Sequence, residues 1–276
     1  MQDLRVTLVQ ADLVWEDISA NLNHLDETLN TLTEETDLIV LPEMFSTGFT
    51  MAAASLAEDM NGSAVQWICA KSRQKVVDVA GSVIIREDGK FYNRLLWARP
   101  DGALLSYDKR HLFRMAGEEK VYCAGNNLLT VSLKGWNIRP FICYDLRFPA
   151  WVRNVGNAYD VAIFVANWPE RRSAHWQKLL VARAIENQSF VVGVNRVGKD
   201  GNGFDFSGDS TVIDPLGGEL LTLRYLPGVH TVRLSAKTLL SYRKEFPAWM
   251  DADADLINWD TGRQCPCRTK AKRMPA

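Results

Sequence analysis

The chain has 276 residues, of which 47% are hydrophobic and 24% charged, and its 32 basic and 33 acidic side chains leave a net charge of -1. Because unspecific binding to nucleic acid depends on an excess of Lys and Arg, this balance argues against a nucleic-acid or membrane-surface role. A chain of this length can bury about three quarters of the surface that it exposes when unfolded, so a single core needs no disulfide framework or structural metal.

The N-terminal residues show neither the basic region nor the apolar core of a signal peptide. No apolar stretch approaches the roughly 18 to 20 residues that a helix needs to span a bilayer. With four histidines, and no second ligand pair near Cys265 and Cys267, we expect no metal site. The five cysteines lack framework spacing, which favours free thiols in a reducing compartment. We therefore expect a soluble, cytoplasmic protein with no membrane or nucleic-acid partner.

The first part of the chain alternates between predicted strands and helices. Leucines at positions 22, 25, 29 and 32 recur at the spacing of an amphipathic helix. A second helix is predicted over 63–74. Asp88-Gly89 favours a tight hairpin turn between two strand-like runs. The predicted strands of this part cover 4–10, 37–41, 76–86, 90–99 and 104–107.

The second part begins with a stretch, 109–126, that lacks a clean period and is predicted to be mainly loop. Loops of this length inside a compact domain tend to be functional. Strands are predicted over 128–133, 137–143, 160–166, 190–196 and, in several pieces, 206–234, with helices over 174–187 and 236–243. This mixture predicts an α/β layered sandwich covered by helices, with residues 1–258 as one domain and 259–276 as a disordered basic tail.

Three polar side chains stand where predicted strands end. Glu43 ends a nearly apolar run, and Lys109 ends the strand at 104–107 and opens the long loop. Cys143 ends another apolar run just before a predicted turn into a helix, an environment that favours a thiolate. Taken singly, each has a structural alternative, with Cys143 as a buried small side chain and the other two as a surface or structural ion pair. Together they indicate a ligand site at the ends of the strands.

The segments around these residues match a known pattern. Leu41-Pro-Glu43-Met-Phe45, Tyr107-Asp-Lys109-Arg-His-Leu-Phe113 and Ile142-Cys143-Tyr-Asp-Leu-Arg-Phe148 resemble, in order and spacing, the catalytic blocks of the nitrilase (carbon–nitrogen hydrolase) superfamily. The resemblance runs from about residue 4 to residue 249. Within the superfamily the chain is most similar to bacterial omega-amidases of the YafV type, through the segments at 45–49, 109–115, 165–169, 175–188 and 245–249.

The resemblance implies a four-layer α-β-β-α sandwich that assembles as a homodimer, with the helix ending at Asn187-Gln188 as a candidate contact, and that works without a cofactor. It also implies hydrolysis of a carboxamide through a thioester on Cys143. Glu43 would act as the base, while Lys109 and the backbone N–H of Tyr144 would stabilise the oxyanion.

The family pattern also implies a second glutamate, which would hold the lysine and the substrate amide. It falls at Glu118, with Glu119 as the rival position and a solvated loop charge as the structural alternative. An omega-amide substrate, such as 2-oxoglutaramate or succinamate, also carries a free carboxylate. Arg171 is the leading candidate to bind that group. Arg147 is a second candidate, with a structural role in the elbow as its alternative. Asn167 and Trp168 are expected to line the pocket.

Other functions stay open at this point. A nitrilase or an N-carbamoyl amidohydrolase would use the same three residues with a different pocket. A catalytically idle binding module is disfavoured by the complete set of Glu43, Lys109 and Cys143.

Overall fold

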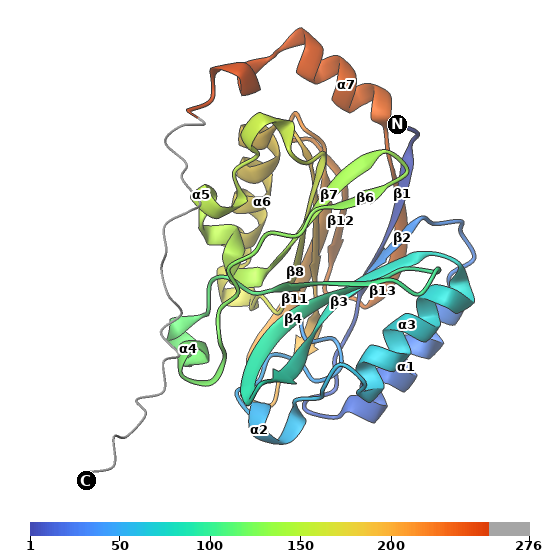
Figure 1. Cartoon of the computed structure of the whole chain (residues 1–276), viewed down its shortest axis with the longest axis vertical. Helices are drawn as coiled ribbons and strands as arrows, with labels where there is room; N and C mark the ends of the chain where they lie inside the picture. The colour runs from blue at the N-terminus through green and yellow to red at the C-terminus, as the bar shows by residue number, and fades with distance from the viewer. Residues whose placement is uncertain (254–276) are drawn as a thin grey trace.

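The computed structural model describes residues 1–253. In this range the chain forms two β-sheets that pack face to face, with helices on the outer face of each (Figure 1). The four-layer α-β-β-α order predicted above is therefore confirmed. The predicted domain boundary at 258 and the tail at 259–276 lie outside the described residues.

The first sheet has the strand order β13-β1-β2-β3-β4-β5. Its inner strands β1, β2 and β3 run parallel, and the others pair antiparallel with their neighbours. The strands are β1 (Leu4–Gln10), β2 (Leu38–Val40), β3 (Asp78–Glu87), β4 (Lys90–Ala98), β5 (Leu104–Asp108) and β13 (Gly228–Leu234).

The second sheet has the order β10-β11-β9-β8-β7-β6, and β12 also pairs with β11. Its central strands β7, β8 and β9 are parallel. The strands are β6 (Val131–Leu133), β7 (Trp136–Ile142), β8 (Val161–Ala166), β9 (Phe190–Asn195), β10 (Val197–Lys199), β11 (Asp205–Ile213) and β12 (Glu219–Arg224).

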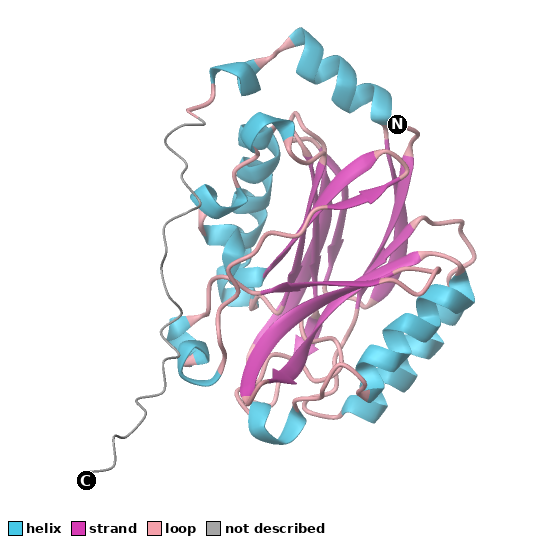
Figure 2. Cartoon of the chain, in the orientation of Figure 1, coloured by secondary structure: helices cyan, strands magenta, loops and turns pink. Residues whose placement is uncertain are grey.

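Each sheet has its own cover of helices (Figure 2). α1 (Ile18–Asn30) and α3 (Ser63–Lys75) cover the first sheet, and α5 (Pro149–Val152) and α6 (Ser173–Asn187) cover the second. α7 (Ala236–Glu245) lies beyond one end of the sheets. Shorter turns lie in the connections: α2 (Ala53–Leu56), α4 (Glu118–Val121), η1 (Arg114–Ala116), η2 (Cys143–Arg147), η3 (Val155–Asn157), η4 (Glu170–Arg172) and η5 (Ala248–Asp251).

The apolar patterns of the sequence explain this layering. Leu25 and Leu29 of α1 are fully buried against the first sheet, as their helical spacing predicts. Every residue of β8 is buried, because this strand lies between the other sheet and the helices. A large apolar cluster joins side chains of both sheets and fills the sandwich between them.

Two connections bear on the predictions. The hairpin at Asp88-Gly89 is confirmed, and both residues have positive φ angles, 49° and 71°, as a type I′ turn requires. The stretch 109–126 contains the 3-10 turn η1 and the single-turn helix α4 and is otherwise loop, as predicted. This loop leads from the edge strand β5 back toward the second sheet, so it can bring side chains to the end of the sandwich.

Candidate active site

The polar residues at the strand ends meet in one buried cluster. Glu43 follows β2, Lys109 follows β5, Cys143 follows β7 and Asn167 follows β8. β2 and β5 belong to the first sheet and β7 and β8 to the second, so the cluster joins the two sheets at the carboxyl ends of these strands. Glu43 and Lys109 are only 0% and 1% exposed to solvent.

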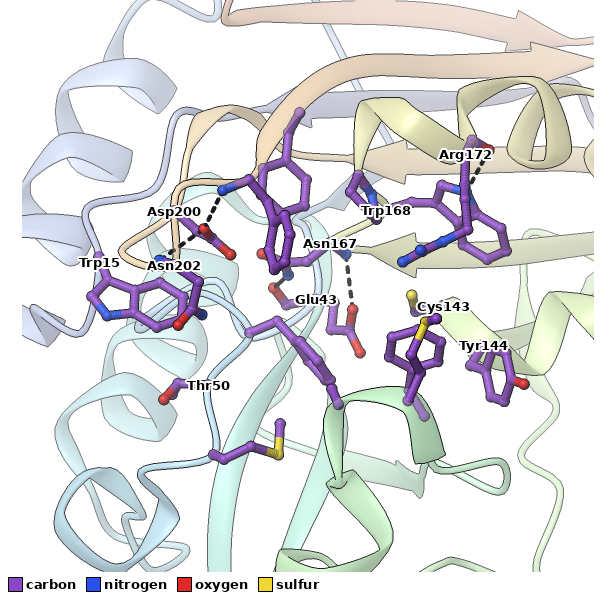
Figure 3. A pocket seen from close by; sticks show the side chains of 18 of the residues that line it. Trp15, Glu43, Thr50, Cys143, Tyr144, Asn167, Trp168, Arg172, Asp200 and Asn202 are labelled. Carbon is purple, nitrogen blue, oxygen red and sulfur yellow. Dashed lines mark hydrogen bonds between the residues drawn. The ribbon is translucent and has the colours of Figure 1, made fainter.

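The Glu43 carboxylate receives hydrogen bonds from several elements. Its Oε1 accepts from Lys109 Nζ at 2.9 Å and from Asn93 Nδ2 at 2.8 Å. Its Oε2 accepts from the backbone N–H of Asn167 at 2.8 Å (Figure 3). The Cys143 thiol is also hydrogen-bonded to Glu43. The carboxylate therefore lies within reach of a thiol proton, which is the geometry that a general base needs.

Lys109 is buried between two carboxylates. Its Nζ donates to both oxygens of Glu118 at 3.0 Å, in addition to Glu43. Burial by itself lowers the pKa of Lys109, but the negative charges of Glu118 and Glu43 outweigh burial and raise that pKa above its usual value. The ring of Phe49 lies 5.0 Å from the ammonium. Lys109 is thus a fixed, permanently charged donor beside the thiol.

Of the two adjacent glutamates, Glu118 is the one that reaches the lysine. It is fully buried and also accepts a hydrogen bond from the backbone N–H of Phe113. Glu119 instead pairs with Arg114 at 3.4 Å, away from the cluster. Burial and the charge of Glu43 raise the pKa of the Glu118 carboxyl, against the opposing effect of Lys109. The geometry favours Glu118 over Glu119 as the second acidic residue of the site.

Cys143 sits at a sharp turn between β7 and η2. Its φ angle is +43°, a left-handed conformation that is uncommon for a residue with a side chain. Burial raises the pKa of the Cys143 thiol well above its usual value, and the charge of Glu43 raises it further. The charge of Lys109 lowers this pKa, but by a smaller amount. Burial and the charges of the two nearby carboxylates thus oppose the thiolate that the turn was predicted to favour, whereas the charge of Lys109 supports it.

A cavity of about 580 Å³ opens onto Glu43, Lys109 and Cys143. It is large enough for a small organic substrate and is lined largely by aromatic and apolar side chains with a few polar groups, as small-molecule sites commonly are. Figure 3 shows Glu43 between two groups of lining side chains, with Cys143, Tyr144, Trp168 and Arg172 to one side and Trp15, Asp200 and Asn202 to the other.

Both predicted arginines line this cavity. Arg147 stacks on Trp168 with its guanidinium carbon 4.7 Å from the ring, and its Nη2 forms a hydrogen bond of 3.0 Å with His175 Nδ1. Arg171 lies 4.4 Å from the ring of Phe204 and is exposed. Within residues 1–253, neither arginine forms an ion pair with a carboxylate.

A third arginine, which the sequence did not single out, also lines the cavity. Arg172 extends toward Cys143 in Figure 3, and its guanidinium carbon lies 5.2 Å from the ring of Phe113. Burial lowers the pKa of Arg172, and the like charges of Arg171 and Arg147 lower it further. An anion bound among the three guanidinium groups would relieve this repulsion. Arg171 and Arg172 are adjacent and of the same residue type, so no local sequence signal separates them. They differ only in the direction in which their side chains point.

The alternative for Arg147 was a structural role in the elbow after Cys143, and another arginine fills that role. The carbonyl oxygen of Leu146, in the turn after Cys143, accepts hydrogen bonds from Arg183 Nε at 3.1 Å and Arg183 Nη2 at 2.7 Å. Arg183, in α6, is only 4% exposed. The arginine that anchors the elbow is therefore Arg183, which leaves Arg147 facing the cavity.

Tyr144, Asn167 and Trp168 lie where the sequence places them, on the cavity wall. The side-chain amide of Asn167 donates to the backbone carbonyl of Glu43, and the backbone N–H of Trp168 donates to Asn195 Oδ1 at 2.8 Å. These bonds connect the end of β8 to the rest of the site. The wall beside the thiol is therefore rigidly held.

Sequence reasoning missed Asn93, which lies in β4 and donates to Glu43. Its side-chain Oδ1 accepts from Ser82 Oγ at 2.8 Å, so its amide group has a fixed orientation. Asn is uncommon in buried strands. An Asn in the middle of a predicted strand is the signal that could have identified it.

Within residues 1–253, no group of three or more His, Cys, Asp or Glu side chains is arranged to hold a metal ion. Across the same residues, helices of the length and apolar character required to traverse a bilayer do not occur.

Comparison with known proteins agrees with this site. Residues 5–244 match the family model of carbon-nitrogen hydrolases. The chain is 51% identical to omega-amidase YafV of Escherichia coli strain K12 over 256 residues, covering 92% of this chain and 98% of that protein. It is 32% identical to a 2-oxoglutaramate amidase of Bacillus subtilis, covering 91% and 98% of the two chains.

A solved structure extends the likeness to three dimensions. XC1258 of Xanthomonas campestris, described as a CN-hydrolase superfamily protein with an arsenic adduct in its active site, superposes with a TM-score of 0.90 at 46% identity. The match covers 92% of this chain and 98% of that one. The family model spans the strands, the loop and the turn that carry Glu43, Lys109 and Cys143. The chain therefore belongs to the carbon–nitrogen hydrolase family.

Proposed function

We propose that this protein is an omega-amidase, which hydrolyses the terminal carboxamide of an α-keto acid omega-amide, such as 2-oxoglutaramate, or of a succinamate-like compound. The products are the dicarboxylate and ammonia. The observation that carries the proposal is the buried pair of Glu43 and Lys109 beside the part-exposed thiol of Cys143, in a cavity that three arginines also line. Relatives named omega-amidase and 2-oxoglutaramate amidase, which align over more than nine tenths of both chains, support the same activity.

In the first half of the proposed reaction, Cys143 Sγ attacks the amide carbon while its proton passes to Glu43. The tetrahedral intermediate places negative charge on the former carbonyl oxygen, where Lys109 Nζ and the backbone N–H of Tyr144 donate hydrogen bonds. Glu43 then returns the proton to the nitrogen, because ammonia leaves far more readily than an amide anion. The C–N bond breaks, ammonia departs, and a thioester with Cys143 remains.

In the second half, Glu43 removes a proton from a water molecule that attacks the thioester. The same donors stabilise the second oxyanion, the C–S bond breaks, and the sulfur of Cys143 regains a proton. Glu118 holds Lys109 throughout by accepting two of its three hydrogen bonds, so the third, which Glu43 accepts in the structure, is the one that turns to the oxyanion. Each step thus needs one group that transfers a proton and one fixed cation. In this cluster these are Glu43 and Lys109.

The free carboxylate of the substrate requires a cation away from the reacting carbon. Arg171, the leading candidate from the sequence, and Arg147 both line the cavity, and Arg172 lines it with them and points toward Cys143. Since Arg172 is part-buried and surrounded by like charge, a carboxylate gains most from binding there. Asn167 and Trp168 complete the wall on this side.

We further propose that residues 1–258 act as one catalytic domain in the cytoplasm and that the protein assembles as a homodimer. Three cysteines of the described residues are free thiols, which suits a reducing compartment. The side chains of Asn187 and Gln188 are buried in bonds within the chain, to Asn154 and Phe246 among others. A contact through α6 would therefore use its exposed side chains, such as Ile185.

The decisive experiment measures ammonia release by the purified protein from 2-oxoglutaramate, with nitriles and N-carbamoyl compounds as competing substrate classes. We expect ammonia and 2-oxoglutarate in equal amounts, and a fall of at least about 10⁴-fold in kcat for Cys143→Ala. Activity that survives this substitution would overturn the thioester mechanism. Faster turnover of nitriles or carbamoyl compounds than of omega-amides would overturn the substrate class.

The carboxylate site is tested with a matched pair of substrates, succinamate and the uncharged butyramide. Arg172→Ala should raise KM for succinamate about 10- to 100-fold, the loss expected for a charge-assisted hydrogen bond, and leave KM for butyramide nearly unchanged. Arg171→Ala is measured in parallel, and the larger rise in KM for succinamate identifies the arginine that contributes more to carboxylate binding. Equal effects on both substrates would remove the arginines from carboxylate recognition.

A further inference from the structure

A second polar network lies behind the cavity and centres on Asp145, two residues after Cys143. Asp145 is fully buried. Its Oδ1 accepts hydrogen bonds from the backbone N–H of His111 at 2.9 Å and from His111 Nδ1 at 2.8 Å. Its Oδ2 accepts from the hydroxyl of Tyr107 at 2.7 Å and from the backbone N–H of Ile142 at 3.1 Å. Each oxygen thus receives two donors.

These donors come from the two segments that carry the reacting groups. Tyr107 and His111 stand two residues before and two residues after Lys109, and Ile142 directly precedes Cys143. The bonds of Asp145 to Tyr107 and His111 span 38 and 34 positions of the sequence. Asp145 therefore ties the lysine segment to the elbow that holds the thiol.

The elbow itself depends on the same carboxylate. Cys143 has a φ angle of +43°, in the left-handed region, which is unfavourable for a residue with a side chain. The bond from the Ile142 N–H to Asp145 closes the turn that begins at Cys143. A carboxylate that accepts at both oxygens compensates this strain locally and orients the sulfur.

The partners of Asp145 are themselves fixed. The hydroxyl of Tyr107 accepts a hydrogen bond from Trp151 Nε1 at 3.0 Å, so it is oriented to donate to Asp145. The ring of His111 stacks on Phe148 with centroids 3.8 Å apart, and its Nδ1 faces a group that accepts. Aromatic rings thus pack against both side-chain donors of Asp145.

We propose that Asp145 is a positioning residue for catalysis: it sets the placement of Cys143 relative to Lys109 by bonding to the segments of both. The proposal rests on the reaction proposed above for these two residues. Asp145 touches neither the cavity nor the reacting atoms, so its effect passes through Ile142 on one side and Tyr107 and His111 on the other. A displacement of about 1 Å in such a site can cost about 100-fold in rate.

The test compares Asp145→Asn with a matched control, Asp160→Asn. Asp160 is also buried and accepts from the backbone N–H of Asn137 and from Arg243, but it lies at the opposite end of β8 from the site. In Asp145→Asn an amide NH₂ group replaces one carboxylate oxygen. This group cannot accept hydrogen bonds, so it faces two donors whose bonds the oxygen accepted. We expect kcat to fall about 10- to 100-fold with KM within about two-fold, and Asp160→Asn to keep the wild-type kcat.

Alkylation of Cys143 by iodoacetamide, followed by mass spectrometry of its peptide, gives a readout that needs no amide substrate. We expect Asp145→Asn to slow this alkylation by a factor similar to that in kcat, and Asp160→Asn to leave it unchanged. This measurement separates the two proposals, since slower alkylation supports the role of Asp145 even if the protein prefers another substrate class.

A folded Asp145→Asn protein with wild-type kcat and alkylation rate would overturn the proposal. So would a protein that loses thermal stability as Asp160→Asn does but keeps its activity per folded molecule. If Asp145→Asn does not fold, Tyr107→Phe and His111→Phe each remove one side-chain donor and keep the aromatic ring. We then expect each to slow alkylation several-fold, and wild-type rates in both would contradict the proposal.

Discussion

At the scale of single residues, the site is a set of buried charges that hold one another. Lys109 lies between the carboxylates of Glu43 and Glu118, and none of the three has access to solvent beyond about 1%. A buried charge without a partner is costly, whereas here each has a partner within 3.0 Å. The three groups can therefore remain together out of contact with water.

Glu118 and Glu119 are adjacent but have different contacts, so the effects of the same substitution at the two positions can be compared directly. Glu118→Gln removes one of the two charges that hold Lys109, so the ammonium should shift toward Glu43 and away from the oxyanion. We expect kcat for ammonia release to fall about 100-fold, the loss typical of a misplaced oxyanion donor. Glu119→Gln, which changes an ion pair outside the cluster, should stay within about two-fold of wild type.

Similar kcat values in the two variants would show that Glu118 is not part of the reaction. A larger loss in Glu119→Gln would instead exchange the two assignments.

At the scale of elements, the placement of Glu43 depends on how β2 is anchored. Asp37, just before β2, accepts a hydrogen bond from the backbone N–H of Arg5 in β1 at 2.8 Å and pairs with Lys134 in the turn between β6 and β7. One carboxylate thereby connects the first strand of one sheet to a hairpin of the other. This connection lies at the end of the sandwich away from the site.

The pH dependence of stability should report on this anchor. Burial raises the pKa of Asp37, but Lys134 and the Arg5 N–H outweigh it, so the folded pKa lies below the unfolded value. The folded state thus binds this proton less readily than the unfolded state. The resulting stabilisation is present above the unfolded pKa of about 3.9 and is lost as the pH falls through the folded pKa.

We expect Asp37→Asn to lower the free energy of unfolding at pH 7 by about 1–3 kcal/mol, the range for a hydrogen bond to a charged group. Its stability should also fall less steeply than that of wild type below about pH 4. Urea unfolding at a series of pH values measures both effects. Asp88→Asn in the exposed hairpin turn serves as the control, and an equally steep acid loss in Asp37→Asn would refute the linkage.

At the scale of the whole molecule, the two sheets bring together strand ends that are distant in the sequence. Glu43 bonds to Lys109 across 66 positions and to Asn167 across 124. The first bond joins strands of one sheet and the second crosses between the sheets. The site therefore exists only when the sandwich is assembled, and the cavity is the space left at its end between loops of both halves.

Much of this arrangement could be predicted from local patterns. The leucine spacing of α1, the hairpin at Asp88-Gly89 and the strands that end at Glu43 and Cys143 follow from period and turn chemistry, which are properties of short segments. The segments around Glu43, Lys109 and Cys143 also carry the family resemblance, and the family is confirmed. Local segments thus indicate both the chemistry and the class of fold.

Other features depend on contacts that no short segment encodes. The choice of Glu118 over Glu119, the place of Arg172 on the cavity wall and the network around Asp145 depend on which way a side chain points after packing. The pKa of the Cys143 thiol depends on tertiary contacts in the same way, since burial, Glu43 and Glu118 raise it and Lys109 lowers it.

The sequence by itself determined the size, the charge balance, the alternation of strands and helices and the residue types of the reaction. Only the tertiary structure decided how the nearly neutral chain distributes its charge at the site, with Lys109 buried between two acids and three arginines lining the cavity. The physical reason is that burial and long-range pairing set the energy of a charge, and both arise only when the two sheets pack together.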